Sequence, residues 1–303
     1  MEPTKPKLPR EAVQLYNLFI HGEISRRDFM EGVQKFAVGG LTAAAIAEAL
    51  MPNYALGQQV AKNDDRIKAT YETVPSPNGN GSIKGYLVRP ISADTRSETP
   101  TKLPGVIVVH ENRGLNPHIE DVARRFALQN FMAFAPDGLT SLGGYPGDDY
   151  KGGQMFSKVD GKKMAEDFVA AAMWMKARPD CTGKICATGF CYGGGVANTL
   201  AVRLGADIAA VAPYYGGPPM KDDCMKIKAA VMVHHGALDT RLAQTWPAYD
   251  AALNEAKVPH EGYIYPNAVH GFNCDATPER YNKLAADQAW ERTIGWFNKY
   301  ARG

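Results

Sequence analysis

The residues with the clearest chemical potential lie in the segment Thr188–Gly195, whose letters TGFCYGGG place a cysteine among small residues. The segment has the form of a nucleophile elbow with cysteine in place of serine, where the reactive side chain stands on a sharp strand-to-helix turn. Such a turn needs small neighbours because its strained backbone leaves no room for Cβ atoms, and Gly189 and Gly193 meet that need. The helix N-terminus behind the turn favours thiolate over thiol, so Cys191 is the predicted nucleophile. The string alone is also compatible with a glycine-rich turn around a buried cysteine.

A cysteine nucleophile needs a base, and the base needs a group that orients it. His270 follows an expected strand and a Pro/Asn turn and precedes Gly-Phe, which favours it as the base. Asp239 follows the preceding expected strand and is predicted to orient His270, although a turn or helix-capping aspartate is the alternative. Nucleophile, acid and histidine then occur in the chain order of α/β-hydrolases. His234 and His235 are rivals for the base, but their order along the chain does not fit.

A second loop is expected beside the elbow. Residues 110–114, with letters HENRG, close a buried strand that should lie across the sheet from the elbow. The backbone N–H groups of Asn112 and Tyr192 are therefore the predicted oxyanion donors. Glu111 places a carboxylate near the nucleophile, with a solvated loop glutamate as the alternative interpretation.

The elements that must position these groups alternate along the chain. Strands are expected over residues 67–74, 82–89, 105–110, 131–135, 184–187, 208–212, 229–234 and 261–265, and helices over 119–129, 162–177, 196–204, 246–257 and 281–300. A polar loop is expected over residues 92–102. This alternation predicts an α/β fold with a mostly parallel, doubly wound sheet. Reactive groups should lie at the carboxyl ends of its strands.

Composition narrows the class of protein. The chain has 303 residues, 45% of them hydrophobic, which is enough for one large core or one domain with an appendage. Its 34 basic and 32 acidic residues form no basic stripe, so nucleic acid is not an expected partner. Five cysteines show neither a CxxC pair nor Cys/His metal spacing, and we expect no metal and no organic cofactor. No apolar run is long enough for a stable membrane span, and no sequence feature indicates an oligomeric state.

The first 60 residues differ from the rest and carry features of an export signal. Residues 25–30, SRRDFM, resemble a twin-arginine signal, and the mildly apolar residues 36–50 follow them. Residues 55–57, ALG, offer a small-residue cleavage site. This interpretation predicts an exported, periplasmic protein.

The alternative for the same segment is an ordered helical arm in a cytoplasmic protein. Residues 8–19 and 24–36 carry apolar side chains at helical spacing, and Glu48 interrupts the apolar stretch. On either interpretation, residues 1–60 form a signal or helical arm with its linker, and residues 61–303 form the α/β domain.

Taken together, the motifs resemble the dienelactone hydrolase family over roughly residues 67–300. The matching pieces are Glu111 with Gly114, Asp121 with Arg124 and Arg125, Pro136-Asp137, the Gly-Phe-Cys-Tyr-Gly-Gly elbow, Tyr214-Tyr215-Gly216, Gly236 to Asp239 and His270-Gly271-Phe272. The resemblance implies an α/β-hydrolase fold with a Cys191–His270–Asp239 triad and no cofactor. It also implies that Glu111 contacts the resting thiol and helps to deprotonate it when substrate arrives.

The chain departs from that family at the positions that bind a substrate carboxylate. Where family members carry arginines, this chain has residues 140–142, TSL, and Cys274. Arg113, Arg241 and Arg280 are candidates to replace them in space. An uncharged lactone or ester is therefore as plausible a substrate as a dienelactone.

A glycine-rich loop over residues 143–150 is expected near the pocket. Tyr145 in this loop, together with Arg113, is a candidate pocket residue, and a plain surface loop is the alternative.

The predicted function is a hydrolase that cleaves a lactone or small activated ester through an acyl-enzyme on Cys191. The alternatives are a general carboxylesterase without dienelactone specificity and a non-catalytic binding protein that retains the fold. A nucleotide-binding protein is disfavoured because neither a G-x-G-x-x-G motif nor a P-loop lysine motif is present.

Overall fold

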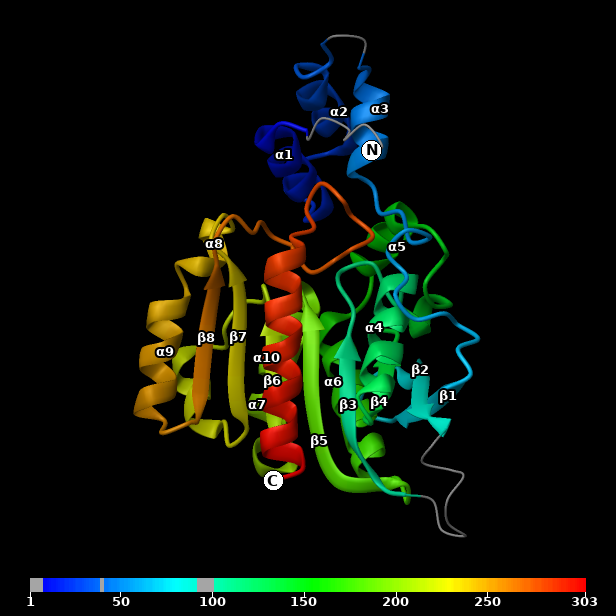
Figure 1. Ribbon diagram of the computed structural model, residues 1–303, viewed down its shortest axis with the longest axis vertical. Coiled ribbons are helices and arrows are strands. Elements are labelled where there is room, and N and C mark those ends of the chain that lie inside the picture. The colour runs from blue at the N-terminus through cyan, green and yellow to red at the C-terminus, as the bar shows by residue number, and fades with distance from the viewer. Residues whose placement is uncertain (1–7, 39–40, 92–100) are drawn as a thin grey trace.

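The computed structural model of the chain describes residues 8–38, 41–91 and 101–303 (Figure 1). Its strands are β1 Ile67–Ser76, β2 Gly81–Pro90, β3 Leu103–Val109, β4 Met132–Pro136, β5 Cys181–Phe190, β6 Ala210–Tyr214, β7 Ala230–Gly236 and β8 His260–Tyr265. Its α-helices are α1 Arg10–Ile20, α2 Arg26–Gln34, α3 Ala43–Leu50, α4 Pro117–Leu128, α5 Asp149–Phe156, α6 Gly161–Ala177, α7 Tyr192–Leu204, α8 Thr240–Ala243, α9 Trp246–Glu255 and α10 Lys283–Ala301. Short 3₁₀ turns occupy Thr140–Leu142, Gly205–Asp207 and Lys221–Lys226.

One eight-stranded sheet organises the described chain, in the order β1-β2-β4-β3-β5-β6-β7-β8. β2 pairs antiparallel with both β1 and β4, and every pairing from β4 to β8 is parallel. The strands β3 and β7 are buried along their whole length, as expected for parallel strands covered on both faces. The predicted mostly parallel, doubly wound sheet is confirmed.

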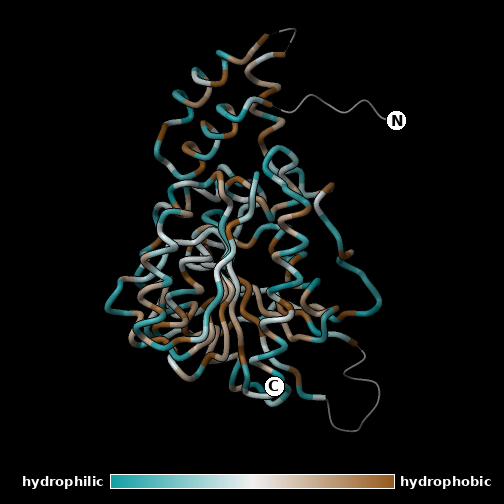
Figure 2. The backbone as a smooth tube through the Cα atoms, turned by 60° about the vertical axis from the view of Figure 1, so that its left-hand side comes forward, coloured by the Kyte–Doolittle hydropathy of each residue, from teal (hydrophilic) through white to brown (hydrophobic). Residues whose placement is uncertain are grey.

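Helices cover both faces of this sheet (Figures 1 and 2). Helices α6, α7 and α9 pack on one face through a cluster that includes Phe168, Leu200 and Leu253. Helices α4 and α10 pack on the other face through a cluster that includes Phe126 and Phe297. The two layers hold the strands rigidly, so that the loops at their carboxyl ends are carried on a fixed support.

Several elements differ from the sequence expectation: β5 extends beyond residues 184–187 at both ends, and no expected helix corresponds to α8. Helix α7 begins at Tyr192, directly after the expected nucleophile, rather than at residue 196. Helix α5 begins inside the segment 143–150, for which the sequence predicts a loop. Its two glycines disfavour a helix, but a Cβ at Gly152 would lie 2.4 Å from the Arg113 carbonyl oxygen, so packing requires glycine there. Most of the polar loop expected over 92–102 lies outside the described residues.

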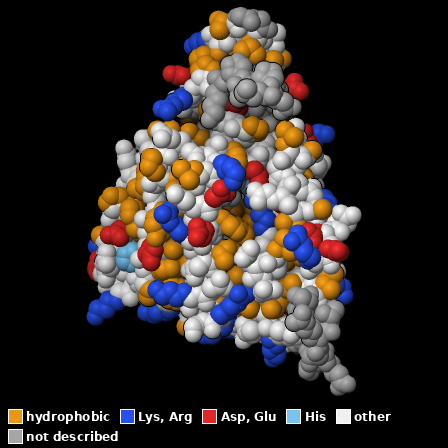
Figure 3. All heavy atoms as spheres, viewed as in Figure 1, with side chains coloured by type: hydrophobic (Ala, Val, Ile, Leu, Met, Phe, Trp, Pro, Cys, Tyr) orange, Lys and Arg blue, Asp and Glu red, His pale blue; other side chains and the backbone are white. Residues whose placement is uncertain are grey.

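The N-terminal arm, defined here as residues 8–50, forms helices α1, α2 and α3 above the carboxyl edge of the sheet (Figure 1). Helix α2 begins at a capping box in which the Ser25 side chain and the Asp28 carboxylate each accept from the other's backbone N–H. The arm has a hydrophobic cluster of its own, made of Ala12, Val13, Tyr16, Ile20, Phe29, Val33, Ile46, Ala47 and Leu50. In the space-filling view it stands as a narrower projection on the broad α/β body (Figure 3). Among the described helices, none combines the length and apolarity needed to cross a bilayer.

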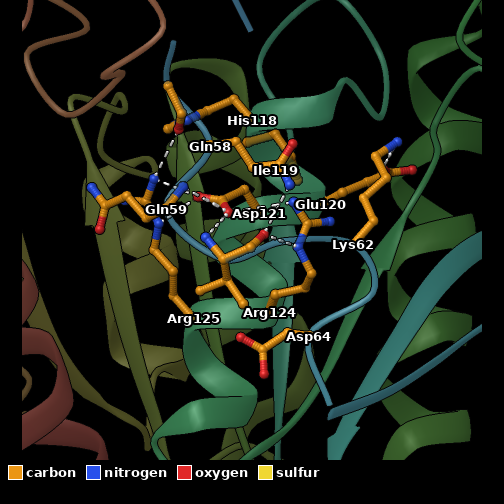
Figure 4. Close-up of polar contacts among 12 residues, drawn as sticks. Gln58, Gln59, Lys62, Asp64, His118, Ile119, Glu120, Asp121, Arg124 and Arg125 are labelled. Carbon is orange, nitrogen blue, oxygen red and sulfur yellow. Dashed lines mark hydrogen bonds and ion pairs between the residues drawn. The ribbon is translucent and has the colours of Figure 1, made fainter. Parts of the chain in front are cut away.

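The linker, residues 51–66, is fastened to the α/β body by a buried polar network around Asp121 of α4 (Figure 4). The Asp121 carboxylate accepts from the backbone N–H groups of Gln59 and Val60, at 3.1 and 2.8 Å. Nε of Arg124, a fully buried side chain, donates to the carbonyl of Val60 at 2.7 Å. Arg125 bridges Asp121 to Asp275, with Nη2 2.5 Å from a carboxylate oxygen of each.

The linker also touches the body ahead of this network. The Asn53 N–H donates to the carbonyl of Ala276 at 2.6 Å. A Cβ at Gly57 would lie 2.5 Å from the Ala276 nitrogen, so only glycine fits where the two backbones meet. Residues 53–60 are therefore held in place on both sides of Gly57.

Candidate active site

Cys191 occupies a strained turn between β5 and α7. Its backbone has φ 54° and ψ −112°, a conformation rare for a residue with a side chain. A Cβ at Gly189 would lie 2.1 Å from the Gly193 carbonyl oxygen, and one at Gly193 would lie 2.4 Å from the Val109 carbonyl oxygen. Both glycines are thus required by close backbone approach, as the sequence predicts. The turn aims the Cys191 side chain out of the carboxyl edge of the sheet.

Asp239 and His270 meet at the same edge, because β7 and β8 pair in parallel and end side by side, Gly236 opposite Tyr265. Nδ1 of His270 lies 2.6 Å from Oδ2 of Asp239. Both side chains are buried. Burial acts to raise the pKa of Asp239, but the hydrogen bond and charge of His270 outweigh it and hold the pKa of that carboxyl below its usual range. Asp239 is therefore ionised and fixes the orientation of the His270 ring.

The Cys191 sulfur faces two imidazoles. Nε2 of His21 lies 3.3 Å from Sγ, and ring nitrogens of His21 and His270 both lie within 4.8 Å of Sγ and of each other. Burial acts to raise the pKa of the Cys191 thiol, but the charge on His270 and the hydrogen bond between His21 and the sulfur lower it to about 6. Burial acts to lower the pKa of His270, but the thiolate and Asp239 raise it to about 10. The surroundings therefore favour a thiolate beside an imidazolium.

His21 is the site residue that sequence reasoning missed. It follows the last residue of α1, and its Nδ1 lies 2.6 Å from the carbonyl oxygen of Asn17 one turn earlier. Its ring packs edge-on against that of His270, with centroids 4.8 Å apart. No local signal points to it, because only histidines downstream of Cys191 fit the expected order. The single hint is a histidine placed between two segments of helical spacing.

The loop after β3 lies beside the elbow and contacts the N-terminal arm. The side chains of Asn112 and Arg113 both donate to the carbonyl of Ile20, at 2.8 and 2.9 Å. Among the described residues, no backbone carbonyl accepts from the N–H of Asn112 or Tyr192 in a turn, loop or cap. The role of these two amides as an oxyanion hole stays a prediction.

For three further predicted site residues, the hydrogen bonds in the described part of the chain involve groups other than the Cys191 sulfur. In the described part of the chain, no hydrogen bond joins the Glu111 carboxylate to Cys191, whose sulfur faces His21 instead, so the role of Glu111 stays a prediction. The Tyr145 hydroxyl donates to Asp149 at 2.8 Å. Arg113 packs against α5 and Ile20. Pocket roles for Tyr145 and Arg113 likewise stay predictions.

A cavity of about 950 Å³ is lined by residues of both the arm and the α/β body. His21 lines it from the arm, and Asp239 and His270 line it from the body, whereas Cys191, Tyr145 and Arg113 do not. Arg241 and Arg280, two of the candidate carboxylate-binding residues, are also in its wall. Nε and Nη1 of Arg280 are buried and have no hydrogen-bond partner among the described residues, and its guanidinium lies over the Tyr16 ring at 5.2 Å.

The rival histidines lie elsewhere. His234 is fully buried between the hydroxyls of Tyr265 and Thr293, and burial lowers its pKa to about 3. Burial also lowers the pKa of His235, to about 4. Both are therefore neutral near pH 7, and neither makes a hydrogen bond to Cys191.

Comparisons with known proteins agree on one family. The model of the Dienelactone hydrolase family matches residues 83–301. The "Putative carboxymethylenebutenolidase" of Escherichia coli (strain K12) is 31% identical over 252 residues, 78% of this chain and 89% of the relative. The "Putative hydrolase fragment YghX" of the same strain is 54% identical over 120 residues, 40% of this chain and 97% of the relative.

Solved structures give the same result. The crystal structure of a "Putative Dienelactone Hydrolase" from Klebsiella pneumoniae is 28% identical, with a TM-score of 0.66 over 77% of this chain and 99% of that one. A dienelactone hydrolase-like promiscuous phosphotriesterase from metagenomic libraries is 27% identical, with a TM-score of 0.64 over 77% of this chain and 98% of that one.

Proposed function

Because the chain belongs to the dienelactone hydrolase family of ester-cleaving enzymes, we propose that it hydrolyses a lactone or small activated ester through a Cys191–His270–Asp239 triad. One observation carries the proposal. Beside Cys191 on its strained turn stands His270, whose Nδ1 is held 2.6 Å from the Asp239 carboxylate. That contact leaves the opposite nitrogen of the ring free to exchange a proton with the thiol.

In the proposed reaction the Cys191 thiolate attacks the ester carbonyl carbon while its proton resides on His270. The N–H groups of Asn112 and Tyr192 stabilise the oxyanion of the tetrahedral adduct. Collapse expels the alcohol or enol oxygen, which takes the proton from His270, and leaves a thioester on Cys191. Water activated by His270 then releases the acid and restores the thiol.

The substrate needs a reactive carbonyl. A tetrahedral adduct on sulfur expels thiolate more readily than alkoxide, so an enol lactone or an activated ester reacts forward while an amide does not. The cavity between arm and body is of a size typical for small ligands. Arg241 and Arg280 in its wall are our candidates for binding a substrate carboxylate, in place of the arginines that this chain lacks.

The test is a time course of 4-nitrophenyl acetate and dienelactone hydrolysis by the wild-type protein and Cys191→Ala. We expect turnover by the wild type and none by Cys191→Ala, with Cys274→Ala, a buried cysteine outside the triad, as the matched control. Turnover of the ester alone would indicate a general carboxylesterase. Absence of turnover and of covalent labelling of Cys191 would support a non-catalytic binding protein.

A further inference from the structure

Three potential metal ligands converge where the N-terminal arm meets the elbow. One ring nitrogen of His21, Sγ of Cys191 and one ring nitrogen of His270 all lie within 4.8 Å of one another. The three residues come from the end of α1, the start of α7 and the loop after β8. Because they are far apart in sequence, Cys/His spacing along the chain gives no indication of the cluster.

In both His21 and His270, the hydrogen bond at Nδ1 determines which protonation states Nε2, the opposite ring nitrogen, can adopt. Nδ1 of His21 lies 2.6 Å from the Asn17 carbonyl oxygen, which only accepts, so Nδ1 carries a hydrogen and a neutral ring keeps its lone pair on Nε2. Nδ1 of His270 donates in the same way to the Asp239 carboxylate. Cys191 and His270 share one exchangeable proton, so its loss leaves two ring nitrogens and a thiolate as three lone-pair donors that converge on one point.

One of these three atoms lacks a hydrogen bond in the structure. Nε2 of His270 is buried and makes no hydrogen bond of normal geometry to a described residue, although Nδ1 of the same ring is held by Asp239. A buried polar atom without a partner is costly and calls for an explanation. A cation that accepts lone pairs from both rings and from the sulfur would satisfy all three at once.

We propose that His21, Cys191 and His270 form a binding site for a divalent transition metal ion, with Zn²⁺ as the best fit. Zinc binds thiolate and imidazole, and its bond lengths in a tetrahedron place sulfur and nitrogen ligands about 3.5 Å apart. The distance of 3.3 Å from His21 Nε2 to Cys191 Sγ matches that spacing. Each histidine is oriented through Nδ1 by a carbonyl or carboxylate oxygen, as metal-binding histidines usually are.

Metal binding releases one proton and blocks both the sulfur and the base of the proposed reaction. Zn²⁺ displaces the one proton that Cys191 and His270 share, which leaves to solvent, and three protein ligands leave a fourth position open for water. The sulfur lone pair that would attack an ester is then committed to the metal, and so is the nitrogen of His270 that would take the proton. The ion also fixes His21, and with it the arm, over the elbow. That metal binding inhibits hydrolysis rests on the proposed function, whereas metal binding itself does not.

The binding test uses the full chain after treatment with a chelator, titrated with Zn²⁺ in a calorimeter. We expect one ion per chain and an affinity lowered at least about tenfold in His21→Gln, since even changes to the groups that orient metal ligands cost about 10–100-fold. His260→Gln is the matched control, because His260 pairs with Asp250 beside β8, outside the cluster, and its loss should leave the affinity unchanged. No binding, or equal affinity in the wild type and His21→Gln, would overturn the site.

A spectroscopic readout identifies the sulfur ligand. Co²⁺ in place of Zn²⁺ should give a thiolate-to-cobalt charge-transfer band in the wild type, and Cys191→Ser should lose that band. A band of equal strength in Cys191→Ser would place the metal on another cysteine and overturn the assignment.

Measuring hydrolysis with and without Zn²⁺ distinguishes the proposed metal site from the proposed hydrolase function. Zn²⁺ should inhibit the chelator-treated wild type, and His21→Gln should require at least about tenfold more Zn²⁺ for the same fractional inhibition. Zn²⁺ binding without any hydrolysis by the metal-free chain would leave the metal site standing and remove the proposed function. Hydrolysis unaffected by bound Zn²⁺, or dependent on it, would overturn the inhibitory role.

Discussion

Nε2 of His21 lies 3.3 Å from Sγ of Cys191, although 170 residues separate them along the chain. The contact makes the N-terminal arm part of the site rather than an appendage beside it. The carbonyl of Ile20, one residue earlier, accepts from the side chains of Asn112 and Arg113 in the loop after β3. The end of α1 therefore touches the nucleophile and the loop that carries an expected oxyanion donor.

Replacing the orienting carboxylate tests the triad. In Asp239→Asn the amide no longer stabilises imidazolium or fixes the ring, so we expect kcat for 4-nitrophenyl acetate to fall by roughly 10²–10⁴-fold. Asp250→Asn is the matched control because Asp250 contacts another histidine, His260, in the same way at 3.1 Å. Steady-state kinetics provide the readout. Similar losses in both variants would mean that Asp239 is not part of the catalytic group.

A pair of glycine substitutions in α7 tests the geometry of the elbow. A Cβ in Gly193→Ala would lie 2.4 Å from the Val109 carbonyl oxygen, so we expect a loss of about 1–3 kcal/mol in the free energy of unfolding. A Cβ at Gly195 would meet no described atom within 4 Å, so Gly195→Ala should leave stability unchanged or raise it by up to about 1 kcal/mol. Urea unfolding measures both. An equally stable Gly193→Ala would show that the turn is looser than described.

Substituting Asp121, at the centre of the linker network, tests how much the buried ion pairs of this network stabilise the fold. Asp121→Asn leaves the fully buried Arg124 without its carboxylate partner, and breaking a buried pair typically costs about 3–5 kcal/mol. Asp207→Asn, which removes a surface pair with Lys176, should cost no more than about 1 kcal/mol. Thermal and urea unfolding compare the two. A loss in Asp121→Asn as small as that in Asp207→Asn would contradict a structural role for this network.

The same network predicts an acid-dependent loss of stability. Burial acts to raise the pKa of Asp275, but hydrogen bonds from His118 and Gln59 and the charges of His118 and Arg125 lower it to about 2. Because the folded value lies below the unfolded value of about 3.9, the ionised form stabilises the fold above pH 4, and this contribution is lost between about pH 4 and pH 2. Asp275→Asn should be less stable near neutral pH and lose less on acidification. Urea midpoints across that range measure the difference, and parallel curves would contradict it.

The export hypothesis for residues 1–60 is testable in cells. We expect Arg26→Lys, Arg27→Lys to remain in the cytoplasm of a bacterial host while the wild type reaches the periplasm, as a twin-arginine signal requires. Fractionation with immunoblotting measures the distribution, and the intact mass shows whether cleavage follows Gly57. Equal distribution of both chains would favour the ordered arm in a cytoplasmic protein.

The sequence predicts the features that depend on local pattern. Gly189 and Gly193 around Cys191 indicate the elbow, and buried apolar runs alternating with helical periods indicate the parallel sheet. Since parallel strands end at one edge, the positions of Asp239 and His270 after their strands already imply their meeting.

What the sequence could not predict depends on contacts between distant segments. His21 carries no local signal, because only the docking of α1 brings it to Cys191. Helix α5 could not be predicted, because its Gly152 is required by the backbone of Arg113 in another loop. The sequence shows Arg124 only as part of a family pattern. In the structure its side chain donates a hydrogen bond to the Val60 carbonyl and so holds the linker on the α/β body.

The fastened linker has a kinetic and thermodynamic consequence for the arm. Helix α3 ends at Leu50, and Asn53 is already bonded to Ala276, so only Met51 and Pro52 lie between the arm and its anchor. An arm that leaves the elbow therefore stays tethered beside it, and His21 returns as an intramolecular group whose effective concentration is of roughly millimolar order or higher. Its encounter with Cys191 is consequently independent of how far the protein is diluted, and no second molecule is needed to close the site.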